Sequence, residues 1–337
     1  MNPKPTLKQL AEKLQLSTST VSKALKDSSE ISEDTKTRVK ELAKLMGYRP
    51  NIAAASLRNR ETRTIAVVLP EIVNDFFGQV LMGIEEEASL HNYKIVICIS
   101  NESYKKEREY MEMFSNGAVD GFIIAAAMET QELGESDHYN DILNSGLKLV
   151  MFDRVIESVD CDKIIVDDAA SGARLVDFLK YRGDRHICIA TTIDKLSVGK
   201  LRAQGINERI KKFEELQSTI VSQEEDADFS KNIEEVLKKK TIQSVIALDQ
   251  RAGIMTLNKA HELGIQVPKE LQIISYSNST LAKYSFPQLT IVDQHSRDLG
   301  KKTFTRILNL LKNKDEVQVT RVHTLKTSLV ERGTTRK

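Results

Sequence analysis

The stretch Thr6-Leu-Lys-Gln-Leu-Ala-Glu-Lys-Leu-Gln-Leu-Ser-Thr-Ser-Thr-Val-Ser-Lys-Ala-Leu25 decides the fold of the N-terminal part of the chain. Its apolar residues recur at helical spacing in two runs, Leu7, Leu10, Ala11 and Leu14, then Val21, Ala24 and Leu25. Thr6 and Gln9 fit a capping box for the first helix, and Ser17 or Thr18 can cap the second. The pattern predicts two short helices joined by a tight turn.

A third helix is expected to follow, with a cap at Ser32, an apolar stripe of Val39, Leu42, Ala43 and Met46, and a stop at Gly47. Three helices of this size suit a helix-turn-helix, whose second helix enters the DNA major groove. A generic three-helix bundle would show the same periodicity. Charge favours the DNA reader, because residues 1–60 hold 12 of the 49 basic but only 6 of the 48 acidic residues.

The remaining sequence alternates apolar runs with amphipathic helical patterns. Nine runs have strand character: Ile65–Leu69, Lys94–Ile99, Gly121–Ala126, Leu147–Phe152, Lys163–Val166, His186–Ala190, Ser244–Leu248, Leu271–Tyr276 and Leu289–Val292. Near-continuous apolar strands separated by helices predict parallel sheets covered on both faces. Nine strands favour two doubly wound lobes over one.

Motifs of catalysis and of cofactor binding are missing from the sequence. No glycine-rich dinucleotide fingerprint follows a strand, the histidines never fall at metal-ligand spacing, and Ser197-Val-Gly-Lys200 lacks the upstream glycine of a phosphate loop. We therefore expect no enzyme, no cofactor and no metal. The three cysteines predict buried free thiols in a reducing compartment. Without an apolar signal or a membrane-spanning run, a cytoplasmic protein is expected.

Two further motifs, Gly47-Tyr-Arg-Pro-Asn51 and Ser56-Leu-Arg58, extend the opening stretch into a sequence that resembles the head of the lac repressor (LacI/GalR) family. The resemblance implies base-reading positions at Thr18, Ser19 and Lys23. It implies phosphate-holding positions at Ser17, Thr20, Ser22, Tyr48 and Asn51. Thr6, Ala54, Leu57 and Arg58 complete the implied DNA-binding set.

Residues 50–60 correspond to the hinge helix of that family. Its three alanines favour a helix, but a segment this short is unstable alone in water, so we expect it to fold only when it docks. By resemblance, Leu57 wedges between base steps in the minor groove, a device that kinks DNA. Packing of Leu57 in a protein core is the alternative, and the neighbouring Arg58, Asn59 and Arg60 argue against it.

The body resembles the core of the same family, which has the periplasmic-binding-protein-like type I fold. We expect a head at 1–49, a hinge at 50–60 and a core at 61–337. Lobe one would comprise about 61–160 and 294–323, and lobe two about 161–293 and 324–337. The implied effector-binding residues are Asn74, Phe76, Phe77, Asp153, Arg154, Arg202, Asp249, Ser277 and Gln294. For each phenylalanine, packing in the helix core is an equally weighted alternative.

Two departures from the family pattern bear on the ligand. Leu248 stands where the family has Asn, and Ser277 stands where it has Asp. The missing carboxylate commonly accepts hydrogen bonds from ligand hydroxyls, so a simple sugar is not assured. A modified or acidic saccharide, a phosphorylated metabolite and a partner protein remain alternatives.

The expected function is that of a DNA-binding transcriptional regulator of the repressor type. A small, carbohydrate-related ligand in the cleft between the lobes would control its affinity for double-stranded operator DNA. Without a C-terminal leucine heptad, a homodimer is favoured, matching a near-palindromic operator. A solute-binding protein of the same fold and an enzyme with a regulatory head are the competing classes.

Overall fold

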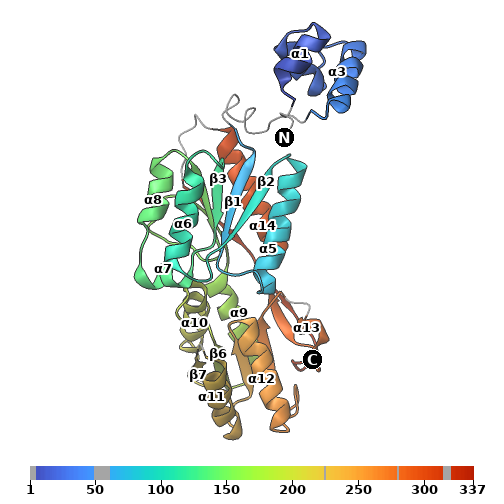
Figure 1. Cartoon of the computed structure of the whole chain (residues 1–337). Coiled ribbons are helices and arrows are strands. Elements are labelled where there is room, and N and C mark those ends of the chain that lie inside the picture. Colours follow the sequence, from blue (N-terminus) through green and yellow to red (C-terminus); the bar gives the residue numbers. More distant parts are fainter. Residues whose placement is uncertain (1–4, 49–60, 224, 279–280, 314–319) are drawn as a thin grey trace. The chain divides into compact units, whose positions relative to one another are not determined.

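The computed structural model describes residues 5–48, 61–223, 225–278, 281–313 and 320–337. The chain divides into two compact units, Met1–Thr62 and Arg63–Lys337 (Figure 1). The expected hinge at 50–60 lies outside the described residues and stays a prediction. Among the described helices, none combines the length and the apolar character needed to cross a membrane.

The described residues of the first unit form three helices, α1 (Leu7–Leu14), α2 (Thr18–Leu25) and α3 (Glu33–Leu45). The predicted capping box is confirmed, since Gln9 N donates to Thr6 Oγ1 at 3.3 Å and Thr6 N donates to Gln9 Oε1 at 2.8 Å. Gln15 then turns the chain in a left-handed conformation. The predicted apolar faces meet in one small core that contains Leu10, Ala11, Val21, Ala24, Val39 and Ala43.

The second unit is built on two six-stranded sheets with helices on both faces. The first sheet has the order β11-β5-β4-β3-β1-β2. Its strands are β1 (Thr64–Leu69), β2 (Lys94–Ile99), β3 (Gly121–Ile124), β4 (Lys148–Phe152), β5 (Asp162–Val166) and β11 (Val322–Leu325), all parallel. Its helices are α5 (Asp75–Leu90), α6 (Tyr104–Ser115), α7 (Met128–Leu133), α8 (Asp137–Asn144) and α14 (Ser296–Lys312).

The second sheet repeats this arrangement in the order β12-β10-β9-β8-β6-β7. Its strands are β6 (His186–Thr191), β7 (Gln217–Ser222), β8 (Ser244–Ala247), β9 (Gln272–Tyr276), β10 (Thr290–Asp293) and β12 (Ser328–Val330). Only β12 runs antiparallel to its neighbour. The helices are α9 (Asp168–Tyr181), α10 (Ser197–Ile210), α11 (Asp226–Lys238), α12 (Gln250–Glu262) and the short α13 (Leu281–Tyr284). The predicted two doubly wound lobes are confirmed.

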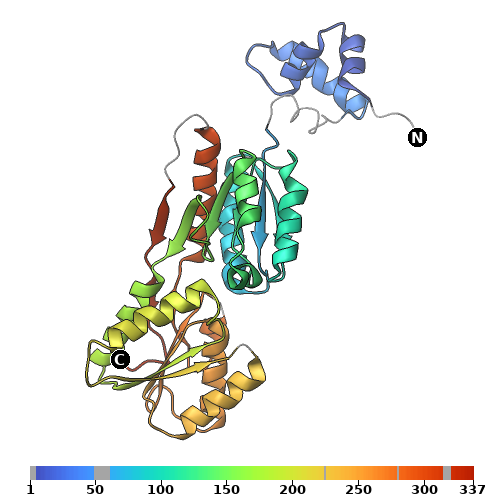
Figure 2. The same cartoon turned by 90° about the vertical axis from the view of Figure 1, so that its left-hand side faces the viewer.

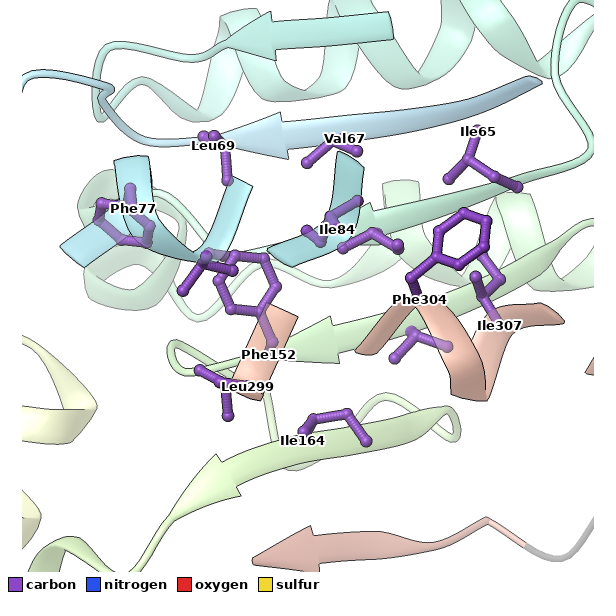
Figure 3. Close-up of a cluster of buried hydrophobic side chains, with 14 of the residues drawn as sticks. Ile65, Val67, Leu69, Phe77, Ile84, Phe152, Ile164, Leu299, Phe304 and Ile307 are labelled. Carbon is purple, nitrogen blue, oxygen red and sulfur yellow. The ribbon is translucent and has the colours of Figure 1, made fainter. Parts of the chain in front are cut away.

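Each sheet is sealed by one apolar core on each face, as parallel sheets require. Figure 3 shows the core of lobe one, where side chains from β1, β4 and β5 meet those of α5 and α14. Phe77, Phe152 and Phe304 are among its largest buried side chains. Burial of each such side chain contributes about 1.5–3 kcal/mol. The cores fix the strand ends that carry the candidate site.

The lobe boundary differs from the predicted one. We expected lobe two to begin at 161, but β5 pairs with β4 and β11 and therefore belongs to lobe one. Figure 2 shows β11, in red, at the edge of this sheet beside β5, in green. The chain passes between the lobes after β5, after β10 and after β11. The strand character of Lys163–Val166 was recognised, but its sheet depends on pairing that a single sequence does not display.

Candidate functional site

The polar residues of the head that the family resemblance singled out gather at α2. Ser17 is the N-cap, and its hydroxyl lies 2.7 Å from the Ser19 hydroxyl and accepts from Thr20 N at 3.0 Å. Thr18 is exposed, whereas Thr20 and Ser22 are half-buried. Thr6 is exposed at the start of α1, and Tyr48 is half-buried after α3, where burial raises the pKa of its phenol. Asn51, Ala54, Leu57 and Arg58 lie outside the described residues.

Lys23 is the cation of α2 implied to read bases. Its ammonium group donates to Glu30, and both side chains are largely exposed. An exposed ion pair of this kind is worth at most about 1 kcal/mol. Breaking the Lys23–Glu30 pair therefore costs little, and base reading by Lys23 stays a prediction.

In the core unit, all nine residues implied to bind the effector line one cavity of about 70 Å³ between the lobes. Lobe one contributes Asn74, Phe76 and Phe77 after β1, and Asp153 and Arg154 after β4. Lobe two contributes Arg202 from α10, Asp249 after β8, and Ser277 after β9, with Gln294 following β10. These positions lie at or just beyond strand ends, apart from Arg202. The carboxyl edge of an open α/β sheet is the usual place for a ligand.

Arg202 is held by a buried cluster of lobe two. Its Nε donates a hydrogen bond to Asp168 Oδ1 at 2.7 Å, and its NH1 donates to the carbonyl oxygen of Leu248 at 2.7 Å. The guanidinium also lies 4.2 Å from the centroid of the Tyr276 ring. Burial raises the pKa of the Asp168 carboxyl, and the nearby Arg202 opposes that shift. Arg202 is therefore fixed in orientation before any ligand arrives.

Asp153 is the carboxylate that the cluster leaves without a partner. It is 8% exposed, and no described residue donates a hydrogen bond to its side chain. Burial raises the pKa of Asp153 to about 6, opposed by the charge of Arg202 and increased by that of Asp168. Its backbone is left-handed, with φ of 53°. A buried, unpaired carboxylate facing a cavity is suited to accept hydrogen bonds from a ligand.

Arg154 is engaged on the lobe-one side. Its NH1 donates to both carboxylate oxygens of Glu102, at 2.6 and 2.8 Å, and its guanidinium lies 5.3 Å from the centroid of the Phe77 ring. Phe77 is 1% exposed and packs edge-to-face on Phe152. Phe77 thus belongs to the core as well as to the cavity wall, and so does Phe76.

Other implied residues also bond within the protein. Asp249 caps α12 by accepting from Ala252 N at 2.8 Å, and it accepts from Thr192 N at 2.8 Å. Asn74 caps α5 through Phe76 N at 3.1 Å. Ser277 Oγ lies 3.3 Å from Gln250 Oε1. Their first role is to hold the strand ends in place.

Six further residues line the cavity: Ile193, Leu196, Val198, Gln250, Tyr276 and Asn278. Gln250 and Asn278 directly follow Asp249 and Ser277, so adjacency was a usable signal for them. Tyr276 directly precedes Ser277 and had the same signal, whereas the role of Asp168 depends on its contact with Arg202 and was not indicated by the sequence. Leu248 does not line the cavity; its side chain packs in the core of lobe two.

A larger chamber of about 910 Å³ adjoins this inner cavity and shares Asn74, Arg154, Ile193, Leu196, Asp249 and Gln250 with it. Nearby, α7 of lobe one contacts the start of α10 in lobe two. Gln131 Oε1 accepts from Ser197 N at 2.9 Å, Gln131 Nε2 donates to Ser197 Oγ at 3.2 Å, and Glu132 pairs with Lys195 at 3.2 Å. We call these four residues the interlobe bridge. It connects the two faces of the cleft outside the chain crossovers.

Cysteines and potential metal ligands take no part in the site. The three cysteines are free and buried, and burial raises the pKa of Cys98 to about 11 and those of Cys161 and Cys188 to about 12. Within the described part of the chain, no group of three or more His, Cys, Asp or Glu side chains could hold a metal ion.

Both units match known protein families. Residues 6–51 match the family of bacterial regulatory proteins of the lacI type, and residues 176–335 match the periplasmic binding protein-like domain. The HTH-type transcriptional repressor PurR of Vibrio atlanticus is 29% identical over 98% of each chain.

Solved structures show the same fold. The lac repressor dimer bound to operator and the anti-inducer ONPF superposes with a TM-score of 0.85 at 18% identity, over 99% of each chain. A LacI-family regulator from Enterococcus faecium with bound ribose has a TM-score of 0.70 at 22% identity, over 81% of this chain and 98% of that one. The chain belongs to the LacI family, a family of transcriptional regulators rather than enzymes, and joins a helix-turn-helix head to a periplasmic-binding-protein-like core.

Proposed function

We propose that this protein is a repressor whose affinity for operator DNA is controlled by a small, carbohydrate-related ligand bound between the core lobes. The observation that carries the proposal is a cavity lined from both lobes, to which Phe76, Phe77, Asp153, Arg154 and Arg202 all contribute. A ligand that contacts both lobes stabilises one lobe arrangement over others, which is the requirement for a population shift.

The chemistry of the cavity supports a ligand with a ring and hydroxyl groups. Phe76, Phe77 and Asp153 line the lobe-one wall of the cavity, where the carboxylate of Asp153 has no hydrogen-bond donor among the described residues, so this wall suits a ring that carries hydroxyl groups. The ribose-bound Enterococcus faecium regulator, which shares the fold, is consistent with this class.

Control would pass from the lobes to residues 50–60, which precede β1. We propose that the arrangement of the lobes decides whether this hinge forms a helix on DNA, with Leu57 as the wedge and Arg58 beside it. Such couplings are typically ~1–3 kcal/mol. A homodimer would present two heads to a near-palindromic operator.

Titration of fluorescent DNA from the promoter of its own gene tests the proposal. We expect specific binding that exceeds binding to scrambled DNA by ~1000-fold or more and that changes when an effective ligand is added. Equal affinity for both DNAs would contradict the regulator function.

The hinge is tested by Leu57→Ala. Loss of the wedge should weaken specific binding by more than ~1 kcal/mol and leave non-specific binding nearly intact, because the latter rests on phosphate contacts. The two affinities are measured in the same titration. Equal losses on specific and scrambled DNA would show that Leu57 is not a wedge.

A further inference from the structure

The interlobe bridge depends on α7, whose first turn is held by residues from outside the helix. The N-cap residue, Ala127, has no side-chain oxygen that could accept a hydrogen bond from the helix. Instead, Glu107 Oε2 accepts from Ala127 N at 2.7 Å, and Glu102 Oε2 accepts from Met128 N at 2.8 Å. The carbonyl oxygen of Glu102 also accepts from Glu129 N at 3.2 Å. Two carboxylates therefore take the place of the missing cap.

Glu107 is the carboxylate that ties α7 to the core of lobe one. Its side chain is fully buried, and it accepts hydrogen bonds from Thr130 Oγ1 at 2.9 Å and from the hydroxyl of Tyr139. Its Oε1 also lies 2.9 Å from His138 Nε2. All of these partners belong to α7 and α8, so Glu107 holds α7 from the side away from the cleft.

Glu102 is the carboxylate that holds α7 from the side of the cleft. Its side chain is 29% exposed and lines the larger chamber. The carboxylate that accepts from Met128 N also accepts two hydrogen bonds from Arg154 NH1, at 2.6 and 2.8 Å. Arg154 lines the inner cavity as well as the chamber. One carboxylate thus joins the cavity wall to the first turn of α7.

The backbone at Glu102 depends on these contacts. Asn101 and Glu102 are both left-handed, with φ of 51° and 61°. Two successive non-glycine residues keep such a conformation only where surrounding contacts impose it. The bonds from Glu102 to Arg154 and to the first turn of α7 are such contacts. Loss of the bond to Arg154 therefore loosens the hold of Glu102 on α7.

We propose that Glu102 is a positioning residue that couples Arg154, in the cavity wall, to the interlobe bridge. A change in the contact between Arg154 and Glu102 changes the position of α7, and with it the position of Gln131 opposite lobe two. The coupling rests only on contacts within the core unit. Its use in the control of operator DNA rests on the proposed function.

The amide hydrogen of Ser197 reports the bridge from the lobe-two side. Ser197 is the first residue of α10, where an amide cannot donate to a carbonyl within the helix. It donates instead to Gln131 Oε1 across the cleft, at 2.9 Å. Hydrogen exchange of the full chain, resolved to the Ser197 amide by fragmentation in the mass spectrometer, therefore measures how often the bridge opens.

Glu102→Gln is the principal variant, because it keeps the size of the side chain and removes the charge that Arg154 binds. We expect exchange at least ~5-fold faster in residues 127–134 and also at Ser197, across the cleft. Faster exchange confined to 127–134 would mean that Glu102 is a helix cap and nothing more, and would overturn the proposal. Unchanged exchange at both places would overturn it as well.

Two further variants calibrate this measurement. Gln131→Ala removes the acceptor itself, so Ser197 should exchange faster while the first turn of α7 keeps its protection. Glu112→Gln removes an exposed carboxylate of α6 that pairs with Arg108 at 2.7 Å and should leave both regions as in the parent. Thermal unfolding checks that each variant is folded. Equal exchange at Ser197 in the Glu102→Gln and Glu112→Gln variants would contradict the coupling.

Arg154→Met tests the cavity end of the coupling. Methionine keeps an unbranched side chain but cannot donate to Glu102, so Ser197 should again exchange faster. If both residues act through one contact, the double variant Glu102→Gln/Arg154→Met should exceed the stronger single variant by no more than ~2-fold. Effects that multiply in the double variant would show that the two residues act independently, and would overturn the proposal.

The role in repression is tested separately. Parent and Glu102→Gln proteins are titrated with DNA from the promoter of the protein's own gene, and their affinities should differ by ~5-fold or more. If Ser197 exchange responds as expected but the two affinities are equal, the coupling within the core stands and the proposed control of DNA binding through it fails.

Discussion

The two lobes share a strand order but present different faces to the cleft. On the lobe-two face, Arg202 is already fixed by Asp168, Leu248 and Tyr276. On the lobe-one face, Asp153 has no described donor although it is buried. The lobe-two face is thus assembled before a ligand binds, whereas the lobe-one face has a buried carboxylate that still lacks a hydrogen-bond donor. A ligand gains most by supplying the donor that Asp153 lacks while Arg202 stays in place.

The largest expected effect comes from breaking the assembled face. Arg202→Ala leaves Asp168 buried without its cation, which should cost about 3–5 kcal/mol of unfolding free energy. Urea denaturation measures this loss.

Arg209→Ala is the matched control, since Arg209 lies on α10 with Arg202, forms a 2.7 Å pair with Asp177 of α9 and is partly exposed. Its loss should stay within about 1 kcal/mol. Similar losses for the two variants would mean that the Arg202 cluster is no more than a surface pair.

The second-largest expected effect is the pH dependence of stability that arises from the carboxyl group of Asp153. Because its pKa rises from 3.8 to about 6 on folding, the native state binds the proton more tightly than the unfolded state does. Its contribution to stability is therefore most favourable below pH 4 and is lost as the pH rises towards 6.

Asp153→Asn removes this titration, and asparagine tolerates the left-handed backbone at this position. We expect the variant to gain roughly 1–3 kcal/mol relative to the parent between pH 4 and pH 7.5. Unfolding free energies of both proteins at the two pH values give the difference. A difference that does not change with pH would show that Asp153 is not a buried, unpaired acid.

The smallest expected effect concerns the interlobe bridge. Gln131→Ala removes both hydrogen bonds to Ser197 and should cost no more than about 1.5 kcal/mol of unfolding free energy. Gln204→Ala, which removes an exposed bond to Glu208 on α10, serves as its control and should cost even less. A loss for Gln131→Ala that approaches the loss for Arg202→Ala would reverse the ranking.

Much of the fold could be predicted, because apolar runs at strand length report burial directly. The apolar run His186–Ala190 predicts β6. In contrast, β7 (Gln217–Ser222) lies at the edge of its sheet, and most of its residues are polar or exposed, so it has no apolar run that would predict a strand. The short β11 and β12 were missed too, since they exist through pairing with β5 and β10.

The candidate site was predictable where family motifs carry it. Asp153 and Arg202 follow from resemblance, and the cavity brings them together. The state of each side chain was not predictable. That Arg202 is bound and Asp153 is unpaired depends on Asp168 and Tyr276, whose positions require the assembled lobe.

The measurement that tests the central claim most directly is operator affinity with the lobes covalently joined. Gln131→Cys/Ser197→Cys places two thiols at the interlobe bridge, where dibromobimane can link them. The native cysteines should not compete, because their burial and raised pKa values keep them as unreactive thiols. Single-cysteine variants treated with the reagent are the controls.

We expect joined and unjoined proteins to differ ~5-fold or more in specific operator affinity, in line with typical allosteric couplings, and to bind scrambled DNA equally. Identical operator affinity in the joined and unjoined proteins would contradict control of DNA binding by the cleft.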